Sequence, residues 1–223
     1  MKSWNFRSRP IENSRTRLYL ISPPTFELNT FEETLKNALS GGDVACFQLR
    51  LKDLPEDDIR RAGEVLIPIA QANDVAFLLN DDPNLAKSIG ADGVHIGQED
   101  TPYKQARAIM GDDAIVGVTC HDSRHLAMTA IEQGADYVAF GAFYPTETKT
   151  VKSTATLEVL EWWQAMIEAP CVAIGGITVD NAAPLIKSGA DFLAVSGGIW
   201  NYSDGPEKAV AEFNRVIDMT EAT

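Results

Sequence analysis

Basic side chains lie at alternate positions near the end of an apolar run in this 223-residue chain. The run spans 45–50, and Gln48, Arg50 and Lys52 occupy every second position. Alternate residues of a strand point to the same side, so these three side chains are expected to converge. Arginine and lysine buried together need an anion, and their geometry suits a polyphosphate. The alternative is a basic pair on the surface.

Carboxylates follow the next two apolar runs. Asp81 comes directly after 76–80, and Asp100 follows 93–97. Mg²⁺ binds one or two protein carboxylates and completes its shell with water and substrate phosphate. Asp81 and Asp100 are therefore predicted to hold Mg²⁺. Asp82 and Asp100 also precede prolines that suit helix starts, so N-capping is the competing interpretation for these two residues.

Donors for further phosphate oxygens follow the later runs. Thr119 ends 114–119, and the segment 144–149 after the next run carries two threonines and Lys149. Glycine pairs close the last two runs, at 175–176 and 197–198. Glycines there let backbone N–H groups approach a phosphate next to a helix N-terminus. Two anion sites are thus predicted, and two sites imply two small phosphorylated substrates or one ligand with two ends.

The elements that position these residues repeat along the chain. Eight nearly continuous apolar runs are predicted as buried parallel strands: 17–22, 45–50, 76–80, 93–97, 114–119, 137–141, 171–176 and 192–197. Segments with helical spacing alternate with them: 30–40, 56–72, 83–89, 102–110, 123–133, 155–168, 180–188 and 206–219. Gly-Ala-Asp recurs at 90, 134 and 189, which suits a helix C-cap before a strand. Eight such units predict a single (β/α)8 TIM barrel over 17–223, with a doubly wound sheet as the alternative.

The charge and composition of the chain limit the classes of partner that it can bind. The net charge is −13, which disfavours nucleic acid and anionic membranes as partners. Neither a secretory signal nor an apolar run of transmembrane length is visible, so a cytoplasmic location is expected. Residues 1–16 carry several basic side chains and are predicted to form a mobile N-terminal arm. Adjacent Trp162 and Trp163 suggest a homo-oligomer interface.

Cys120 and His95 are residue types that often act in catalysis, but both are predicted to have structural roles here. Cys120 and His121 look like a nucleophile pair, but neighbours on a strand point to opposite faces. The three cysteines, Cys46, Cys120 and Cys171, all lie in or beside apolar runs and are expected to be buried free thiols. His95 lies inside its run and is expected to be a hydrogen-bonded core histidine.

Taken together, the motifs resemble the thiamine phosphate synthase family. They appear in the family's order: QLRLK (48–52), NDD (80–82), HIGQED (95–100), GVTCH (117–121), YPTETK (144–149), GGIT (175–178) and VSGGI (195–199). The resemblance covers roughly 17–217. It implies an enzyme that joins a pyrimidine methyl diphosphate to a thiazole phosphate, releasing pyrophosphate, with Mg²⁺ as cofactor.

The resemblance also implies residue roles. Contacts to the pyrimidine diphosphate fall on Gln48, Leu49, Arg50, Leu51, Lys52, Asn80, Thr119 and Lys149, and among these the catalytic charges are Arg50, Lys52 and Lys149. Contacts to the thiazole phosphate fall on Thr146, Glu147, Thr148, Gly176, Val195 and Ser196. Asp81 and Asp100 hold the Mg²⁺. The family commonly has serine where Thr119 stands, which keeps the hydroxyl and adds a methyl group.

Two other functions remain open at this stage. A related thiazole tautomerase has the same fold but needs one phosphorylated ligand and acid–base groups, for which His121 is the candidate. A non-catalytic barrel that senses a thiamine precursor is the second. Both would dispense with the two carboxylates, and the chain keeps them.

Overall fold

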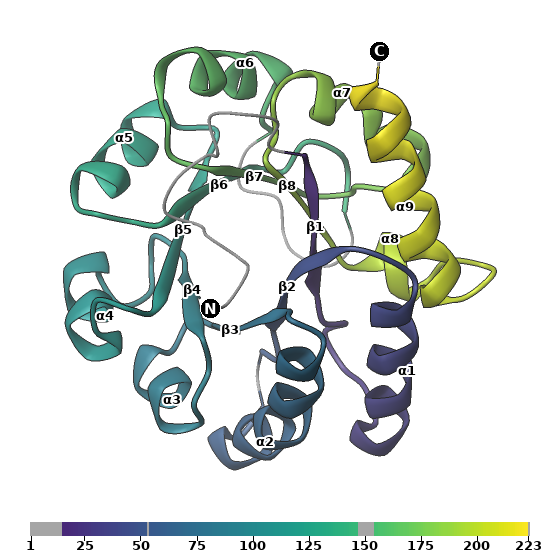
Figure 1. The fold of residues 1–223 in the computed structure, drawn as a ribbon. Coiled ribbons are helices and arrows are strands. Elements are labelled where there is room, and N and C mark those ends of the chain that lie inside the picture. The colour runs from purple at the N-terminus through teal and green to yellow at the C-terminus, as the bar shows by residue number, and fades with distance from the viewer. Residues whose placement is uncertain (1–14, 53, 147–153, 223) are drawn as a thin grey trace.

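The computed structural model describes residues 15–52, 54–146 and 154–222. Within these residues it shows a closed barrel of eight parallel strands in sequence order (Figure 1). The strands are β1 (Arg17–Ile21), β2 (Val44–Leu49), β3 (Ala76–Asn80), β4 (Gly93–Ile96), β5 (Ile115–His121), β6 (Tyr137–Gly141), β7 (Cys171–Ile174) and β8 (Phe192–Val195). Because β1 pairs with β8, the sheet closes. The predicted (β/α)8 barrel is confirmed, and the doubly wound sheet is excluded.

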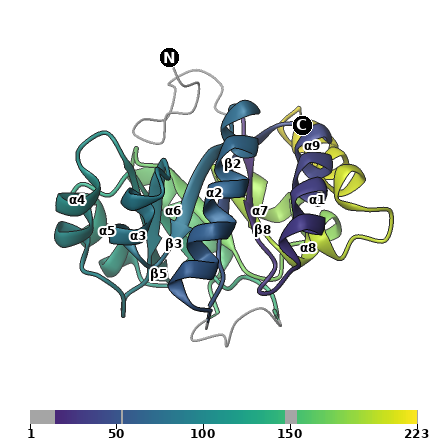
Figure 2. The same cartoon turned by 90° about the horizontal axis from the view of Figure 1, so that it is seen from below.

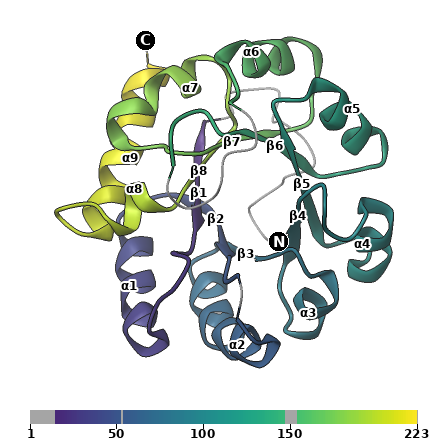
Figure 3. The ribbon, with the colours of Figure 1, turned by 180° about the vertical axis from the view of Figure 1, so that it is seen from behind.

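Helices surround the strands, as the view along the barrel and the view from behind show (Figures 1 and 3). They are α1 (Leu28–Ser40), α2 (Glu56–Ala72), α3 (Pro83–Ser88), α4 (Tyr103–Met110), α5 (Arg124–Glu132), α6 (Leu157–Met166), α7 (Ala183–Lys187), α8 (Gly197–Trp200) and α9 (Pro206–Glu221), with a 3₁₀ turn η1 (Val179–Asn181) before α7. The predicted helix at 180–188 is therefore split. The four-residue α8 was not predicted, because a single turn carries no helical periodicity.

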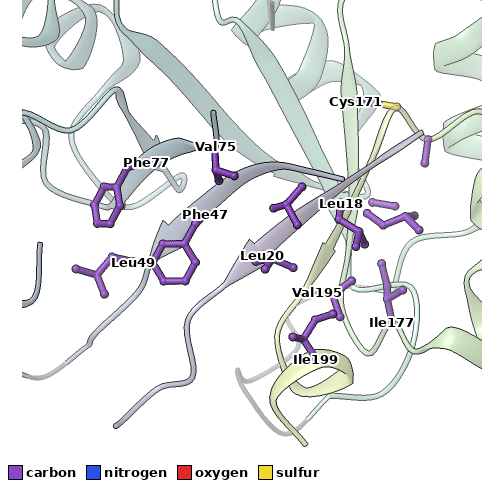
Figure 4. Close-up of a cluster of buried hydrophobic side chains, with 14 of the residues drawn as sticks. Leu18, Leu20, Phe47, Leu49, Val75, Phe77, Cys171, Ile177, Val195 and Ile199 are labelled. Carbon is purple, nitrogen blue, oxygen red and sulfur yellow. The ribbon is translucent and has the colours of Figure 1, made fainter. Parts of the chain in front are cut away.

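Alternating strand residues supply two apolar layers. Leu18, Leu20, Phe47 and Leu49 point outward, toward the helices, and belong to the larger buried cluster (Figure 4). Their neighbours Tyr19, Ile21 and Cys46 point into the barrel. The first layer attaches the helices to the sheet, and the second fills the barrel interior. At the carboxyl ends of the strands, polar side chains replace the inner layer.

The predicted cap positions and cysteines agree with the structure. Gly90, Gly134 and Gly189 have φ values of 75°, 100° and 91°, the left-handed backbone expected of a helix C-cap. All three cysteines are buried and free. Among the described residues, no helix is long and apolar enough to cross a membrane.

The two ends of the described chain meet at one seam. Arg15 donates to Asp218 of α9 at 2.7 Å and to Asp43 at 3.2 Å, and the Thr16 N–H donates to Glu221. The α9 helix packs beside α1 and β1 on the outside of the barrel (Figure 2). Residues 1–14, most of the predicted arm, lie outside the described residues.

Candidate active site

A cavity of about 360 Å³ opens where β2 to β5 end. Asn80, His95 and Thr119 line it from three neighbouring strands, and Asp81 and Asp100 line it from the loops that follow. Gln48 is buried beside it and donates its amide to Asn80 over 2.6 Å. The structure therefore brings together residues that are 71 positions apart in the sequence, from Gln48 to Thr119.

The basic residues of β2 are less enclosed than the sequence suggested. Strand β2 ends at Leu49, so Arg50 and Lys52 lie beyond it. Both line the cavity, but the side chain of Lys52 is 45% exposed and forms an ion pair with Asp81 at 3.0 Å. The expectation that both cations are buried was wrong, because alternation places a side chain on a face without enclosing it. At the cavity rim they can still meet an anion that arrives from solvent.

The two predicted metal ligands face one another. Burial raises the pKa of the Asp81 carboxyl, the neighbouring Asp100 raises it further, and Lys52 lowers it. Two carboxylates this close repel one another when both are charged, and a divalent cation between them offsets that repulsion. Asp81 has a φ of 69°, which turns its side chain out of the strand direction. No cluster of three or more potential ligands occurs in the described part of the chain, and Mg²⁺ needs only one or two carboxylates.

The competing capping interpretation applies to Asp82 alone. The Asp82 carboxylate accepts from the N–H groups of Asn84 and Leu85 and caps α3. Asp100 instead accepts from the Gly97 N–H at 2.7 Å, within its own loop, while Pro102 occupies the cap position of α4. Asp100 is thus held toward the cavity by backbone and is not a helix cap.

His95 and Cys120 behave as expected. Both ring nitrogens of His95 are hydrogen-bonded, to Tyr137 at 2.8 Å and to Thr119 at 2.7 Å. Cys120 points into the outer layer, and burial raises the pKa of its thiol to about 12. His121 lines the cavity on the other face of β5. The cavity therefore has no activated thiol, since Cys120 faces away and is protonated at neutral pH.

The opposite side of the mouth is built from backbone. Gly176 has a φ of 64°, and a Cβ atom there would lie 2.3 Å from the carbonyl oxygen of Pro145. The Asn181 amide donates to the Gly176 carbonyl at 2.9 Å, which fixes the turn after β7. Beside it, Ser196 precedes α8 at the end of β8. Only glycine fits at 176, so the turn after β7 packs directly against the loop after β6. We call the backbone at Gly176, Val195 and Ser196 the backbone cradle.

Comparison with known proteins identifies the family. The family model described as thiamine monophosphate synthase matches residues 18–199. The chain belongs to the thiamine monophosphate synthase family. It is 66% identical over 201 residues to thiamine-phosphate synthase of Rhodospirillum centenum, covering 90% of this chain and 97% of that one. It is 53% identical to that of Hyphomonas neptunium, with 92% and 95% covered.

Solved structures agree with this assignment. Thiamine phosphate pyrophosphorylase from Pyrococcus furiosus superposes with a TM-score of 0.79 at 31% identity, covering 92% of this chain and 96% of that one. A geranylgeranylglyceryl phosphate synthase from Thermoplasma acidophilum reaches 0.69 at 16% identity over 93% and 94%, which shows the shared barrel alone. The chain is an enzyme of the thiamine monophosphate synthase family, and its pathway is thiamine biosynthesis.

The remaining residues that the family resemblance singled out fall into three groups. The side chains of Leu49, Leu51 and Val195 belong to the outer layer, so only their backbone can face the mouth. Thr146 is described at the end of the loop after β6 and is partly buried. Glu147, Thr148 and Lys149 lie outside the described residues, and their roles stay predictions.

Sequence reasoning missed Ser22, which joins the two sides of the mouth of this thiamine monophosphate synthase family member. Ser22 follows β1 and is 1% exposed. Its hydroxyl accepts from the Arg50 N–H at 2.9 Å and donates to the Arg50 carbonyl at 3.3 Å. Its carbonyl accepts from the Ser196 hydroxyl at 3.2 Å. The sequence did contain one sign of this role, since Ser22 is a polar residue at the end of the apolar run 17–22.

Proposed function

We propose that the enzyme condenses 4-amino-2-methyl-5-(diphosphooxymethyl)pyrimidine with a thiazole phosphate, giving thiamine phosphate and pyrophosphate. The observation that carries this proposal is the pairing of Asp81 with Asp100 in a cavity that Arg50 and Lys52 also line. Two anionic and two cationic side chains suit a diphosphate bound together with Mg²⁺. Family membership supplies the reaction that uses such a group.

Arg50 and Lys52 act on the leaving group. As the bond from the pyrimidine methylene carbon to the diphosphate breaks, negative charge builds on the diphosphate oxygens. Arg50 and Lys52 stabilise this charge from the rim, and Lys149 is proposed to do so from the loop after β6. Bound Mg²⁺, held by Asp81 and Asp100, would supply further positive charge to the same oxygens.

No protein nucleophile enters the proposed reaction. The electron-rich aminopyrimidine carries the cation that forms when diphosphate leaves, and the thiazole nitrogen then attacks the methylene carbon. Cys120 faces the outer layer with its thiol protonated. The contribution of the chain is thus positioning and electrostatic stabilisation, with Gln48 and Asn80 orienting the pyrimidine.

The backbone cradle is proposed to hold the thiazole phosphate. Gly176, Val195 and Ser196 contribute backbone groups from the ends of β7 and β8, as in other barrels that bind phosphate there. Thr146, Glu147 and Thr148 are proposed to line the same site from the loop after β6. The two substrates then meet across the mouth, with Ser22 between the two strand ends.

A product assay tests the proposal. Purified enzyme is mixed with the pyrimidine diphosphate, the thiazole phosphate and Mg²⁺, and thiamine phosphate and pyrophosphate are measured. We expect both products in equal amounts, and loss of activity on chelation of the metal that added Mg²⁺ restores. Conversion of a thiazole tautomer without condensation would favour the tautomerase. Binding of a precursor without any turnover would favour the sensor.

Location and assembly stay predictions. A cytoplasmic location is proposed because Cys46, Cys120 and Cys171 are free thiols, as is usual in a reducing compartment. For a homo-oligomer the tryptophan pair offers little surface, because Trp163 is buried and Trp162 is partly covered by the Arg124 guanidinium at 4.7 Å from its ring. Size-exclusion chromatography with light scattering measures the assembly directly.

A further inference from the structure

A chain of hydrogen bonds crosses the barrel interior and returns to the cavity at both ends. Its links are Gln48 Nε2 to Asn80 Oδ1 at 2.6 Å, Tyr19 to Gln48 Oε1 at 2.8 Å, Tyr19 to Tyr137 at 2.9 Å, Tyr137 to His95 Nδ1 at 2.8 Å and His95 Nε2 to Thr119 at 2.7 Å. We call these six residues the relay. Both end residues, Asn80 and Thr119, line the cavity.

The bonds of the relay must all run in one direction. Each hydroxyl has one hydrogen, and a neutral imidazole has one N–H. The direction of one hydrogen bond therefore fixes the direction of the others. Tyr19 donates to Gln48 and must therefore accept from Tyr137. For a neutral imidazole, Tyr137 then accepts from the Nδ1–H of His95. Nε2 is left as an acceptor, and it takes the hydroxyl hydrogen of Thr119.

We propose that Tyr19 and Tyr137 are positioning residues of this enzyme, because the relay sets the hydrogen-bonding state of Thr119 together with that of Gln48. The inference rests on the proposed function. In the direction above, Thr119 offers only lone pairs to the cavity. A diphosphate oxygen accepts hydrogen bonds, so it can bind Thr119 only if the hydroxyl hydrogen turns toward it.

Diphosphate binding at Thr119 therefore reverses the relay. Nε2 of His95 becomes the donor to Thr119, and both tyrosine hydroxyls rotate. The amides of Gln48 and Asn80 each exchange their oxygen and nitrogen ends, so that Asn80 now donates to Gln48. The number of protons is unchanged: the imidazole releases its Nδ1 proton to solvent and takes one at Nε2. Diphosphate binding at Thr119 thereby changes the hydrogen bonds of Gln48, which is proposed to orient the pyrimidine.

The residues around Tyr137 hold its ring in one place. A Cβ atom on Gly117, the neighbour of Tyr137 across β5 and β6, would lie 1.9 Å from the tyrosine ring. The ring also stacks on His95 with 5.7 Å between centroids and 23° between planes. Glycine at 117 leaves the space that the tyrosine fills. An apolar ring there would fill the same space but would leave His95 and Tyr19 without their shared partner.

The imidazole tautomer tests the inference directly. The enzyme is labelled with ¹⁵N-histidine, and His95 is assigned by comparison with variants at His121 and His125. We expect Nδ1–H in the free enzyme and Nε2–H after addition of inorganic pyrophosphate with Mg²⁺. Pyrophosphate that binds while the tautomer stays unchanged overturns the relay and leaves the proposed function standing. Failure of pyrophosphate to bind, measured by calorimetry, contradicts both.

Kinetics of matched tyrosine variants provide the second test. Tyr137→Phe keeps the ring and breaks the relay, and we expect kcat/KM for the pyrimidine diphosphate to fall about 10-fold, with the KM for thiazole phosphate unchanged. Tyr103→Phe is the control, because the Tyr103 hydroxyl is bonded to the Gly134 carbonyl and to Arg107 on the outer side of the barrel. Equal kinetic losses in both variants, or no loss in Tyr137→Phe, would overturn the positioning role.

Discussion

The two sides of the barrel mouth are built differently. On the side of β2 to β5, charged side chains line the cavity, and Lys52 contacts Asp81 directly. On the side of β7 and β8, close backbone packing around Gly176 forms the cradle. Side-chain charges can be rearranged when a metal or an anion arrives. A backbone cradle is neutral and fixed by the fold.

The difference matches the proposed demands on each side. A diphosphate that leaves gains charge during the reaction, so the groups around it must stabilise a changing charge. A thiazole phosphate keeps its charge and only has to be placed, for which rigid N–H groups suffice. Substitutions on the first side should therefore lower kcat, whereas substitutions on the second should raise KM.

The largest effect is expected from Asp81→Asn. Asparagine tolerates the left-handed backbone at φ 69° as aspartate does, so the variant removes the charge without the strain that alanine would add. We expect kcat to fall about 100-fold or more, because one of the two carboxylates proposed to hold Mg²⁺ is lost. Steady-state kinetics at saturating Mg²⁺ measure it.

Asp82→Asn is the matched control for that variant. Asp82 caps α3, and asparagine is an equally good cap, so activity should stay near that of the parent enzyme. Equal losses at 81 and 82 would show that the effect comes from the loop and not from metal binding. The proposal that the side of β2 to β5 acts through a bound metal would then lose its main support.

Gly176→Ala tests the backbone side. The new Cβ atom would meet the Pro145 carbonyl at 2.3 Å and force a left-handed alanine. A strain of about 2 kcal/mol in the bound geometry corresponds to about a 30-fold rise in KM for the thiazole phosphate. The KM for the pyrimidine diphosphate should hardly change, and a fall in kcat instead would contradict the division of labour.

A pair of serine variants separates the two sides at their junction. Ser22→Ala removes the hydroxyl that bonds both backbone groups of Arg50, and Ser196→Ala removes the bond to the Ser22 carbonyl. Leaving the partly buried Arg50 N–H without its partner costs about 1.4 kcal/mol, so Ser22→Ala should lower kcat/KM for the pyrimidine diphosphate about 10-fold. Ser196→Ala should act on the thiazole phosphate, and identical profiles for the two would remove the distinction.

The charged side should also lower stability in the absence of metal. Burial and Asp100 raise the folded-state pKa of Asp81 above its unfolded value. The stability contributed by that group is present below the unfolded pKa and lost as pH rises through the folded pKa. Metal-free Asp81→Asn should therefore melt above the parent enzyme near neutral pH, and the gap should close toward about pH 4. Thermal melts at several pH values check the sign.

The smallest effect is expected from Cys120→Ala. The thiol has a pKa raised to about 12 and packs in the outer layer, so it is protonated and remote from the cavity. We expect unchanged kcat and KM with a loss of about 1 kcal/mol in the free energy of unfolding. Urea denaturation and the product assay measure the two quantities. Loss of activity with the fold intact would restore a role for the thiol.

The barrel was predictable because its signals are local. Runs such as 76–80 and 137–141 are apolar throughout, and the structure places β3 and β6 on the same residues. The joint position of Asp81 and Asp100 followed from the rule that parallel strands end on one side. The exposure of Lys52 could not be predicted in this way, because it depends on the path of the chain after β2 and not on alternation along the strand.

The relay and the Ser22 junction could not be predicted from pattern alone. Tyr19, His95 and Tyr137 lie on strands that are far apart in the sequence, and only closure of the barrel brings their polar atoms within hydrogen-bond distance. The left-handed backbone of Asp81 was equally hidden, since a non-glycine residue gives no local sign of it. Long-range polar contacts, unlike apolar periodicity, leave no spacing rule in the sequence.

The seam between β1 and β8 has a consequence for synthesis of the chain. On the ribosome β1 emerges first, but its second partner strand is made about 175 residues later, at an elongation rate of 5–20 residues per second. Until then one edge of the growing sheet is open, and the partners of Arg15 on α9 do not yet exist. Closure of the barrel, and with it the junction of Ser22 with Ser196, is therefore among the last steps of maturation.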